Sequence, residues 1–266
     1  MGIKTPQSTQ KFSTEHPDIG DKKLRASPLV DNDYISQSER RESGRAARPK
    51  DSATLILLRT DGKAPRVLMG KRSENHIFMP NKFVFPGGKV EVADGRVRVP
   101  SELHPAVLRR LMKGCSETKA RALALAAIRE TYEETGLILG KTAPSVTKSR
   151  SESWGKFLRH GMVPKLEELH YVARAITPPY RNRRFDARFF MVYVDNKSLH
   201  DVSSQASGEL LEIHWVTLNQ ARGLKLPHIT RVMLDEIERR VNMKASYHHE
   251  GPFVYAKHGR FVNGKQ

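Results

Sequence analysis

Residues 129–137 of this chain read RETYEETGL. Three glutamates in that stretch, Glu130, Glu133 and Glu134, are spaced i, i+3 and i+4, so a helix would place their carboxylates on one face within a single turn. Ser116 suits the N-cap of such a helix, which would run through Thr135 and stop at Gly136. The sequence therefore predicts a helix with a concentrated acidic face near its C-terminal end.

Carboxylates this close repel each other by about 1 kcal/mol per pair in water, and by several-fold more near protein. A positive group is expected beside them. Arg129, one turn before Glu133, is one candidate, and a hard divalent cation is the other, because oxygen-only ligands favour Mg²⁺ or Mn²⁺. Taken alone, the three residues also fit an ordinary solvated acidic face.

A glycine-rich bend precedes the acidic helix. The β-rich residues 83–85 run into Pro86-Gly87-Gly88, where the backbone must turn tightly or lie close to another group. Bend and helix together resemble the Nudix signature: Gly, five residues, Glu, seven residues, then Arg-Glu-aliphatic-any-Glu-Glu-any-Gly-aliphatic. The matching positions are Gly88, Arg129, Glu130, Glu133, Glu134, Gly136 and Leu137.

The chain departs from that signature in three ways. Thr131 stands where an aliphatic residue is usual, and Asp94 replaces the first glutamate. Gly88 and Glu130 are 42 positions apart, which implies an insertion of 27 residues at about 95–121. A surface insertion costs only ~0.6 kcal/mol per doubling of loop length, so the two halves can stay in register.

The resemblance implies a metal-dependent hydrolase. Glu130, Glu133 and Glu134, with the Gly88 carbonyl, would hold Mg²⁺ (or Mn²⁺), which would polarise a phosphoryl oxygen and activate water. Arg129 would orient a glutamate through a charge-assisted hydrogen bond.

The general base would be a helix glutamate or a carboxylate from a later loop. Glu209 is the first loop candidate and Glu212 the second, and a solvated loop residue is the alternative for Glu209. The expected catalytic set is therefore Glu133, Glu130, Arg129 and Glu209, and the structural motif comprises Gly87, Gly88, Asp94 and Gly136.

Mixed strands and helices predict one α/β domain, and the resemblance implies a Nudix-type α/β/α sandwich with a mixed β-sheet. We expect a basic leader at 1–50, the domain at 51–245, and a tail or hairpin at 246–266. Expected strands are 53–58, 66–70, 83–85, 169–176, 188–194 and 211–216, with a terminal hairpin at 253–256 and 260–262. Expected helices are 105–113, the acidic helix ending at 135, 218–223 and 228–243.

The substrate is suggested by a second, partial resemblance. Arg72-Ser73 stands twelve residues before residue 85, as in Nudix coenzyme A diphosphatases, although Ile77 and Asn81 depart from that motif. Segments 78–80, 177–178 and 184–190 resemble the long-insert branch of coenzyme A-directed Nudix proteins. Coenzyme A or acyl-coenzyme A is therefore ranked first, ahead of ADP-ribose, nucleotide sugars and other nucleotides. The expected substrate-binding residues are Arg72, Arg181, Arg183, Arg184 and Phe185, the last able to stack on adenine.

The net charge of +17 leaves alternatives open. Residues 1–50 hold ten Lys/Arg and seven Asp/Glu, so most of the excess lies on the remainder. It fits a solvated basic surface, and it also fits attraction of a phosphate-rich small molecule or of nucleic acid. A non-catalytic nucleic-acid-binding Nudix protein and an RNA 5′-end diphosphatase are thus rival readings, although a protein that only binds has no reason to keep all three helix glutamates.

Cysteine content and hydropathy bear on location. Cys115 is the single cysteine, so no intrachain disulfide can form. No apolar run is long enough to cross a bilayer, and no N-terminal secretory signal is evident. We expect a cytoplasmic protein that does not bind membranes. Its oligomeric state is left open, with a homodimer as one option.

Overall fold

The computed structural model describes residues 44–76, 78–143, 149–195, 198–202, 206–257 and 260–265. The leader expected over residues 1–50 therefore lies outside the described residues up to residue 43. Ile77, one of the two departures from the coenzyme A motif, also lies outside them.

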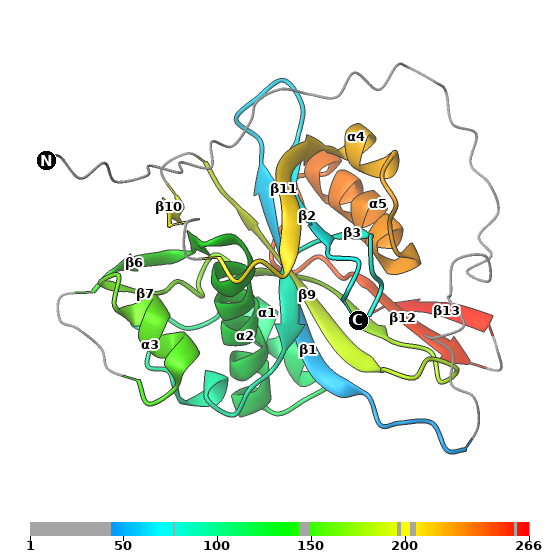
Figure 1. The fold of residues 1–266 in the computed structure, drawn as a ribbon, viewed down its shortest axis with the longest axis horizontal. Helices are drawn as coiled ribbons and strands as arrows, with labels where there is room; N and C mark the ends of the chain where they lie inside the picture. Colours follow the sequence, from blue (N-terminus) through cyan, green and yellow to red (C-terminus); the bar gives the residue numbers. More distant parts are fainter. Residues whose placement is uncertain are drawn as a thin grey trace, which may run out of the picture.

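A nine-stranded mixed sheet forms the centre of the molecule (Figure 1). Its main strand order is β11-β2-β1-β9-β8-β12-β13, with β3 paired to β2 and β4 paired to β1. The β1–β9 and β8–β12 pairs are parallel and the others are antiparallel. The strands are β1 (Lys50–Arg59), β2 (Arg66–Arg72), β3 (Phe83–Val84), β4 (Gly87–Lys89), β8 (His170–Ile176), β9 (Phe185–Tyr193), β11 (Leu210–Thr217), β12 (Pro252–Lys257) and β13 (Arg260–Lys265).

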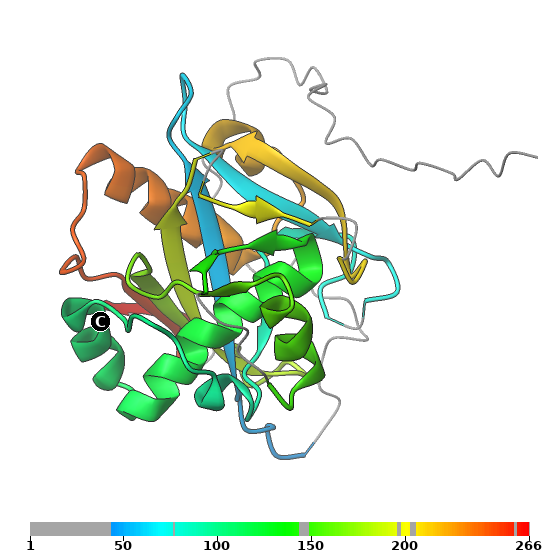
Figure 2. The same cartoon turned by 90° about the vertical axis from the view of Figure 1, so that its left-hand side faces the viewer.

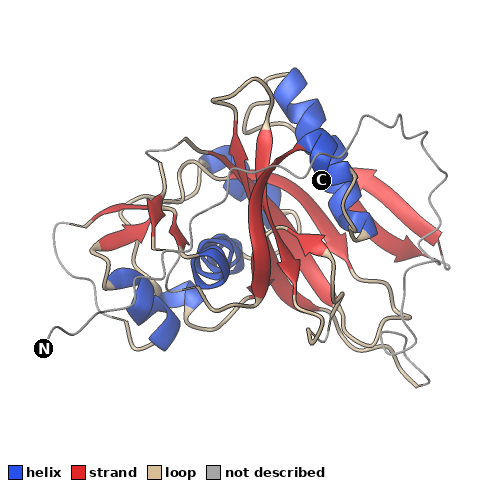
Figure 3. Ribbon diagram, turned by 45° about the horizontal axis from the view of Figure 1, so that its top comes forward, coloured by secondary structure: helices blue, strands red, loops and turns tan. Residues whose placement is uncertain are grey.

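Helices cover both faces of this sheet (Figures 1 and 3). On one side lie α1 (Pro105–Met112), α2 (Glu117–Thr135) and α3 (Glu152–Leu158), and on the other α4 (Leu218–Arg222) and α5 (His228–Asn242). Alternation along β1 explains the two layers: Leu55 and Leu57 belong to the α2 core, whereas Ile56 and Leu58 belong to the α5 core. The predicted α/β/α sandwich is confirmed.

Strand β1 begins at Lys50, three residues before the start expected from its apolar run. The cause is its parallel partner: the register runs from Lys50 opposite Phe185 to Leu58 opposite Tyr193. Pairing with β9 orders the polar residues 50–52 although they lack the apolar pattern of a strand. This extension places the start of β1 beside the β8–β9 turn.

Helix α2 begins and ends where its capping residues predicted. The Ser116 hydroxyl accepts a hydrogen bond from the Lys119 amide, and Gly136 adopts the left-handed conformation with φ 72°. Small and branched apolar residues between them, including Leu123 and Ile128, are fully buried. The helix is therefore locked into the core along its length, which fixes the direction of its acidic turn.

The segment predicted as an insertion, residues 95–121, packs against the domain. It carries α1, whose Val107 and Leu111 are fully buried. The Arg110 guanidinium also donates a 2.8 Å hydrogen bond to the Tyr171 carbonyl of β8. This segment therefore adds a helix to the α2 layer.

Several short elements had no sequence signal. Strand β5 (Leu137–Ile138) pairs with β10 (His200–Asp201), and β6 (Gly140–Thr142) pairs with β7 (Met162–Pro164). Figure 2, which faces this side, shows β6 and β7 next to α2 and α3. Among the described residues, no helix has the length and apolar character that a membrane span requires. The cytoplasmic location stays a prediction.

The C-terminal hairpin forms as predicted and extends the main sheet, because β12 pairs in parallel with β8. Gly251 precedes β12 at a very close backbone approach. A Cβ atom at this position would lie 1.6 Å from the Val172 carbonyl oxygen. Only glycine fits between these two backbones.

A stack of aromatic rings holds the segment that leads into this hairpin. Tyr247 lies between His104 and His170, with ring centroids 4.2 and 4.1 Å away. Burial, together with the charges of Arg240, His104 and Arg110, lowers the pKa of His170 to about 4. The ring is therefore neutral in the fold.

Substituting Gly251 by alanine should destabilise the protein by about 2 kcal/mol or more, because a backbone-to-backbone clash forces β12 away from β8. Urea denaturation measures the change. Gly155→Ala is the matched control, since its added Cβ meets nothing closer than 3.9 Å in helix α3 and should be neutral or slightly stabilising. Equal stability of the two variants would contradict the packing of the hairpin.

Acidification should weaken the fold through His170. Its pKa of about 4 lies below the ordinary histidine value of 6.5, so its contribution to the free energy of unfolding is complete above pH 6.5 and is lost as the pH falls from 6.5 to 4. His170→Phe keeps the stacking and should flatten this part of the profile of unfolding free energy against pH. His214→Gln, on exposed β11 surface, should keep the wild-type slope. A His170→Phe profile as steep as wild type would refute the assignment.

Candidate active site

A buried ion pair anchors the acidic turn of α2. Arg129 is 1% exposed and Asp94 is fully buried. The Arg129 Nε and Nη2 atoms donate to the two oxygens of Asp94 at 2.8 and 3.0 Å, and Nη2 also donates to the Lys89 carbonyl at 2.8 Å. The Arg129 guanidinium thus joins helix α2 to β4 and to the residues that follow β4.

The remaining nitrogen of Arg129 holds two of the predicted site glutamates. Nη1 donates to Glu130 Oε1 at 2.9 Å and to Glu133 Oε2 at 2.8 Å. Burial by itself lowers the pKa of Arg129, but the hydrogen bond to Asp94 and the charges of Glu130, Asp94 and Glu133 outweigh it and raise that pKa. The guanidinium is therefore permanently charged and orients both carboxylates.

Asp94 has two further donors that fix its position. The Trp154 indole Nε1 donates to Oδ1 at 2.8 Å, and the Glu91 amide donates to Oδ2 at 2.7 Å. Trp154 is fully buried, and it supports the site through this bond. No sequence signal pointed to that role, because Trp154 stands 60 positions from Asp94.

The glycine bend lies directly against the acidic turn. The Gly87 amide donates to Glu134 Oε2 at 2.8 Å. A Cβ atom on Gly88 would lie 2.4 Å from the Glu130 carboxyl group, and one on Gly87 would lie 2.5 Å from the Ala53 carbonyl oxygen. Glycine is therefore required at both positions, because a side chain would collide with a neighbouring group. The sequence predicted such a close approach for this bend.

The carboxylates share one electrostatic environment. Burial raises the pKa of Glu134 to about 8, while Arg72 and the Gly87 amide oppose the rise and Glu130 and Glu209 add to it. Burial raises the pKa of Glu130 to about 7, with Arg129 opposing and Glu133 and Glu209 adding. Glu209 therefore acts on both helix glutamates, and a cation among these groups would relieve their repulsion.

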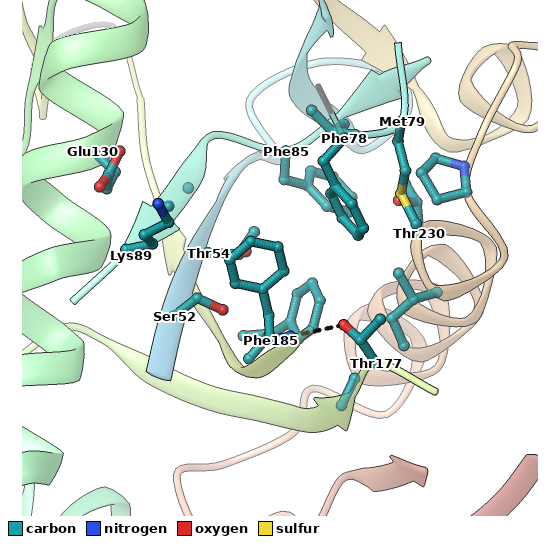
Figure 4. A pocket seen from close by; sticks show the side chains of 18 of the residues that line it. Ser52, Thr54, Phe78, Met79, Phe85, Lys89, Glu130, Thr177, Phe185 and Thr230 are labelled. Carbon is teal, nitrogen blue, oxygen red and sulfur yellow. Dashed lines mark hydrogen bonds between the residues drawn. The ribbon is translucent and has the colours of Figure 1, made fainter. Parts of the chain in front are cut away.

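A single pocket of about 490 Å³ contains this cluster. Its acidic end is formed by α2 and the glycine bend, and its other end is apolar (Figure 4). The sequence-predicted residues that line it are Arg72, Gly87, Gly88, Arg129, Glu130, Glu133, Glu134, Arg181, Arg183, Phe185 and Glu209. Residues that the sequence did not single out for the pocket wall include Phe85, Lys89, Glu91, Ile229, Thr230 and Val254.

Arg72 reaches the pocket wall between the acidic and apolar ends. Its Nη1 donates to the Phe78 carbonyl at 3.0 Å. Burial lowers the pKa of Arg72, and the charges of Glu134, Glu209 and Glu130 oppose that change. The guanidinium therefore adds positive charge close to the carboxylates.

The apolar end is aromatic. Phe78 and Phe185 meet edge to face with ring centroids 5.2 Å apart, and the buried Arg181 lies 6.0 Å from the Phe78 ring centroid. Met79, with φ 54°, turns the loop that carries Phe78. Figure 4 shows Phe78, Phe85 and Phe185 around one space.

Two sequence candidates lie elsewhere. Arg184 does not line the pocket: its guanidinium donates to the carbonyls of Thr177 at 3.0 Å and Ala47 at 2.8 Å and so ties the β8–β9 turn to residue 47. Glu212, the second candidate base, pairs with Lys71 at 2.8 Å and is absent from the pocket wall. Neither side chain lies on the pocket wall, so the structure does not bring Arg184 and Glu212 together with the other predicted site residues.

The donor set fits a hard cation, because carboxylate and carbonyl oxygens meet where the carboxylates repel each other. Within the described ranges, no three His, Cys, Asp or Glu side chains are arranged to enclose a metal ion as they stand. The reason is local: Glu130 and Glu133 direct oxygens at Arg129. Each of these carboxylates keeps a second oxygen that Arg129 does not engage, so both can offer a ligand to a metal ion while the contacts to Arg129 persist.

Comparison with known proteins agrees with this arrangement. A family model described as NUDIX domain matches residues 48–236. A Caenorhabditis elegans protein that carries the name nudix hydrolase 7 is 27% identical over 161 residues, which cover 57% of this chain and 46% of that protein. This chain therefore matches less than half the length of that relative.

A solved structure shares the fold. A NUDIX hydrolase from Alicyclobacillus acidocaldarius superposes with a TM-score of 0.56 at 22% identity, over 74% of this chain and 96% of its own. The NUDIX domain of Shewanella oneidensis NrtR, solved with ADP ribose, gives a TM-score of 0.44 at 11% identity, over 73% and 90% of the two chains.

Asp94→Asn should destabilise the protein by about 3–5 kcal/mol, because it leaves the buried Arg129 without its main counter-charge. Trp154→Phe should cost less, about 1–2 kcal/mol, since it removes one hydrogen bond from Asp94. Urea midpoints measure both changes, and exposed Glu152→Gln serves as the control with an unchanged midpoint. A midpoint for Asp94→Asn equal to that of Glu152→Gln would disprove the anchoring role.

Proposed function

The chain belongs to the NUDIX domain family, and on this premise we propose that it hydrolyses a diphosphate linkage in a nucleotide-type small molecule with the help of Mg²⁺ or Mn²⁺. The observation that carries this proposal is the meeting of the α2 carboxylates, the Gly88 bend and Glu209 in one pocket. Basic groups line the same pocket, so an anionic substrate has both a reactive end and a binding wall.

Glu130, Glu133 and Glu134 are the proposed metal ligands, with the Gly88 carbonyl as a further one. When bound, the metal ion would supply charge stabilisation for phosphoryl oxygens and would lower the pKa of a water molecule. Arg129 acts through Glu130 and Glu133 by keeping their oxygens in place. Asp94 and Trp154 are positioning residues, because they act through Arg129.

Glu209 is the proposed general base. It lines the pocket just before β11, and its charge contributes to the raised pKa values of Glu130 and Glu134, so it lies close enough to act on both. A carboxylate in that position can accept the proton of the attacking water. Glu133 and Glu130 are the alternatives within the helix.

Arg72, Arg181 and Arg183 are proposed to bind the anionic substrate. Arg72 stands beside the carboxylates, where it can contact a phosphoryl oxygen of the substrate and stabilise the charge that develops there. Arg181 lies deeper, against Phe78. Arg183 is exposed at the pocket wall, where it can meet the substrate as it enters.

We place coenzyme A or acyl-coenzyme A first among substrates. The apolar end formed by Phe78, Phe85, Phe185 and their neighbours offers space for a ring or a thioester chain beyond the diphosphate. ADP-ribose, a nucleotide sugar and an RNA 5′ end remain the alternatives to be screened. A purely nucleic-acid-binding protein would instead show RNA affinity that falls steeply with salt and no hydrolysis.

Substituting Glu133 by glutamine should lower kcat by about 100-fold or more with Mg²⁺ or Mn²⁺, because it removes a carboxylate from the metal-binding face. The assay screens coenzyme A, ADP-ribose, nucleotide sugars, dinucleotides and RNA, and follows release of 3′,5′-ADP from coenzyme A. Circular dichroism checks folding, and exposed Glu152→Gln on α3 is the charge-matched control. Hydrolysis that survives Glu133→Gln unchanged would rule out the proposed site.

A further inference from the structure

A second groove of about 420 Å³ adjoins the active-site pocket. It is lined by residues 48–51, before and at the start of β1, and by residues 89–92, at the end of β4. The two segments are held side by side because Ser52 pairs with Lys89 in the sheet. Lys89 and Glu91 line both the groove and the active-site pocket, so the two spaces are adjacent.

Basic side chains gather along this groove. Arg48, Lys50 and Lys89 are all exposed, and no ion pair engages them within the described part of the chain. The exposed Arg183 stands nearby on the pocket wall, because the Lys50 amide donates to the Arg184 carbonyl at 2.9 Å. Residues distant in sequence thus form one basic edge at the mouth of the pocket.

Acidic groups in the groove only partly offset this charge. Asp51 is paired with Lys119, whose Nζ lies 2.7 Å from Oδ2, so it does not neutralise the groove lysines. Glu91 is the other carboxylate on the wall. Arg48, Lys50 and Lys89 therefore stand against Glu91, the groove carboxylate that has no ion pair among the described residues. The groove carries a net positive charge.

The wall of the groove is held in position. Arg184 ties residue 47 to the β8–β9 turn through its bonds to the Ala47 and Thr177 carbonyls. Pairing of Lys50 with Phe185 continues that attachment along β1. The backbone that carries Arg48 and Lys50 is thereby fixed relative to the pocket, which lowers the entropic cost of using these residues for binding.

We propose that this cationic groove, residues 48–51 and 89–92, binds a further phosphate group of the substrate, outside the diphosphate that is cleaved. The proposal rests on the proposed function, since it takes the scissile diphosphate to lie at the α2 carboxylates. Lysines recognise phosphate as point charges and leave it partly hydrated, as an open groove allows. The group could be a phosphate monoester on a nucleotide ribose or the next phosphodiester of an RNA chain.

Paired substrates separate these two sources. One pair is coenzyme A and 3′-dephospho-coenzyme A, and the other is a 5′-triphosphorylated dinucleotide and the corresponding nucleoside triphosphate. Wild-type enzyme should show a lower KM for the member with the extra phosphate in one pair. A preference in the first pair identifies a monoester, and one in the second identifies a phosphodiester.

The variant Lys50→Gln/Lys89→Gln should reduce that preference about tenfold, because two charge-assisted contacts to the phosphate are lost. The matched control is Lys63→Gln/Arg109→Gln, which removes the same charge from exposed positions on the β1–β2 turn and helix α1. It should keep the wild-type preference. An equal loss of the preference in both variants would show a general effect of charge and would overturn the proposal that the groove binds phosphate.

Direct binding separates failure of the groove from failure of the proposed hydrolysis. Adenosine 3′,5′-bisphosphate and adenosine 5′-monophosphate both lack a diphosphate, so their affinities need no catalysis. Calorimetry should show tighter binding of the bisphosphate to wild type than to Lys50→Gln/Lys89→Gln. If no substrate is cleaved but this difference appears, the groove stands and the proposed hydrolysis fails. Absence of both the binding difference and the kinetic preference refutes the groove.

Discussion

The buried Arg129–Asp94 pair is the interaction on which the site depends. A fully buried guanidinium is costly unless its donors are satisfied, and here they reach Asp94, the Lys89 carbonyl, Glu130 and Glu133. This one side chain therefore joins helix α2 to strand β4 and aligns two of the site carboxylates. Without it, only core packing and the bond from the Gly87 amide to Glu134 would hold the acidic turn against the glycine bend, and the repulsion among the carboxylates would not be offset.

The pocket combines two environments that suit a substrate with a charged centre and an apolar or aromatic part. Its acidic end concentrates carboxylates whose raised pKa values reflect burial first and mutual repulsion second. Its other end is lined by aromatic and aliphatic side chains from β9, α5 and the loop at residues 78–80. Arg72 stands between them, so the charge of a bound diphosphate would meet this guanidinium.

Local signals allowed much of the fold and site to be predicted from the sequence. Helix α2 could be bounded because Ser116 and Gly136 act on their immediate neighbours, and the spacing of its glutamates fixes their common face. Long-range contacts could not be predicted in this way. The Trp154 bond to Asp94 and the approach of Lys50 to the β8–β9 turn arise from packing and strand register.

The same limit explains the residues whose positions differ from expectation. Arg184 looked equivalent to Arg181 and Arg183 in sequence, yet its side chain is used to tie two backbone segments together. Glu212 looked comparable to Glu209, but β11 has a register shift between Leu211 and His214, and Glu212 has a φ of 48°. That irregularity directs Glu212 to Lys71 and away from the pocket.

Metal binding by the acidic turn is the central claim, and a Mn²⁺ titration followed by electron paramagnetic resonance tests it without any substrate. The account predicts that wild-type protein and Glu152→Gln bind Mn²⁺ alike, and that Glu130→Gln loses most of this binding while staying folded. Mn²⁺ binding by Glu130→Gln at wild-type affinity would contradict the account.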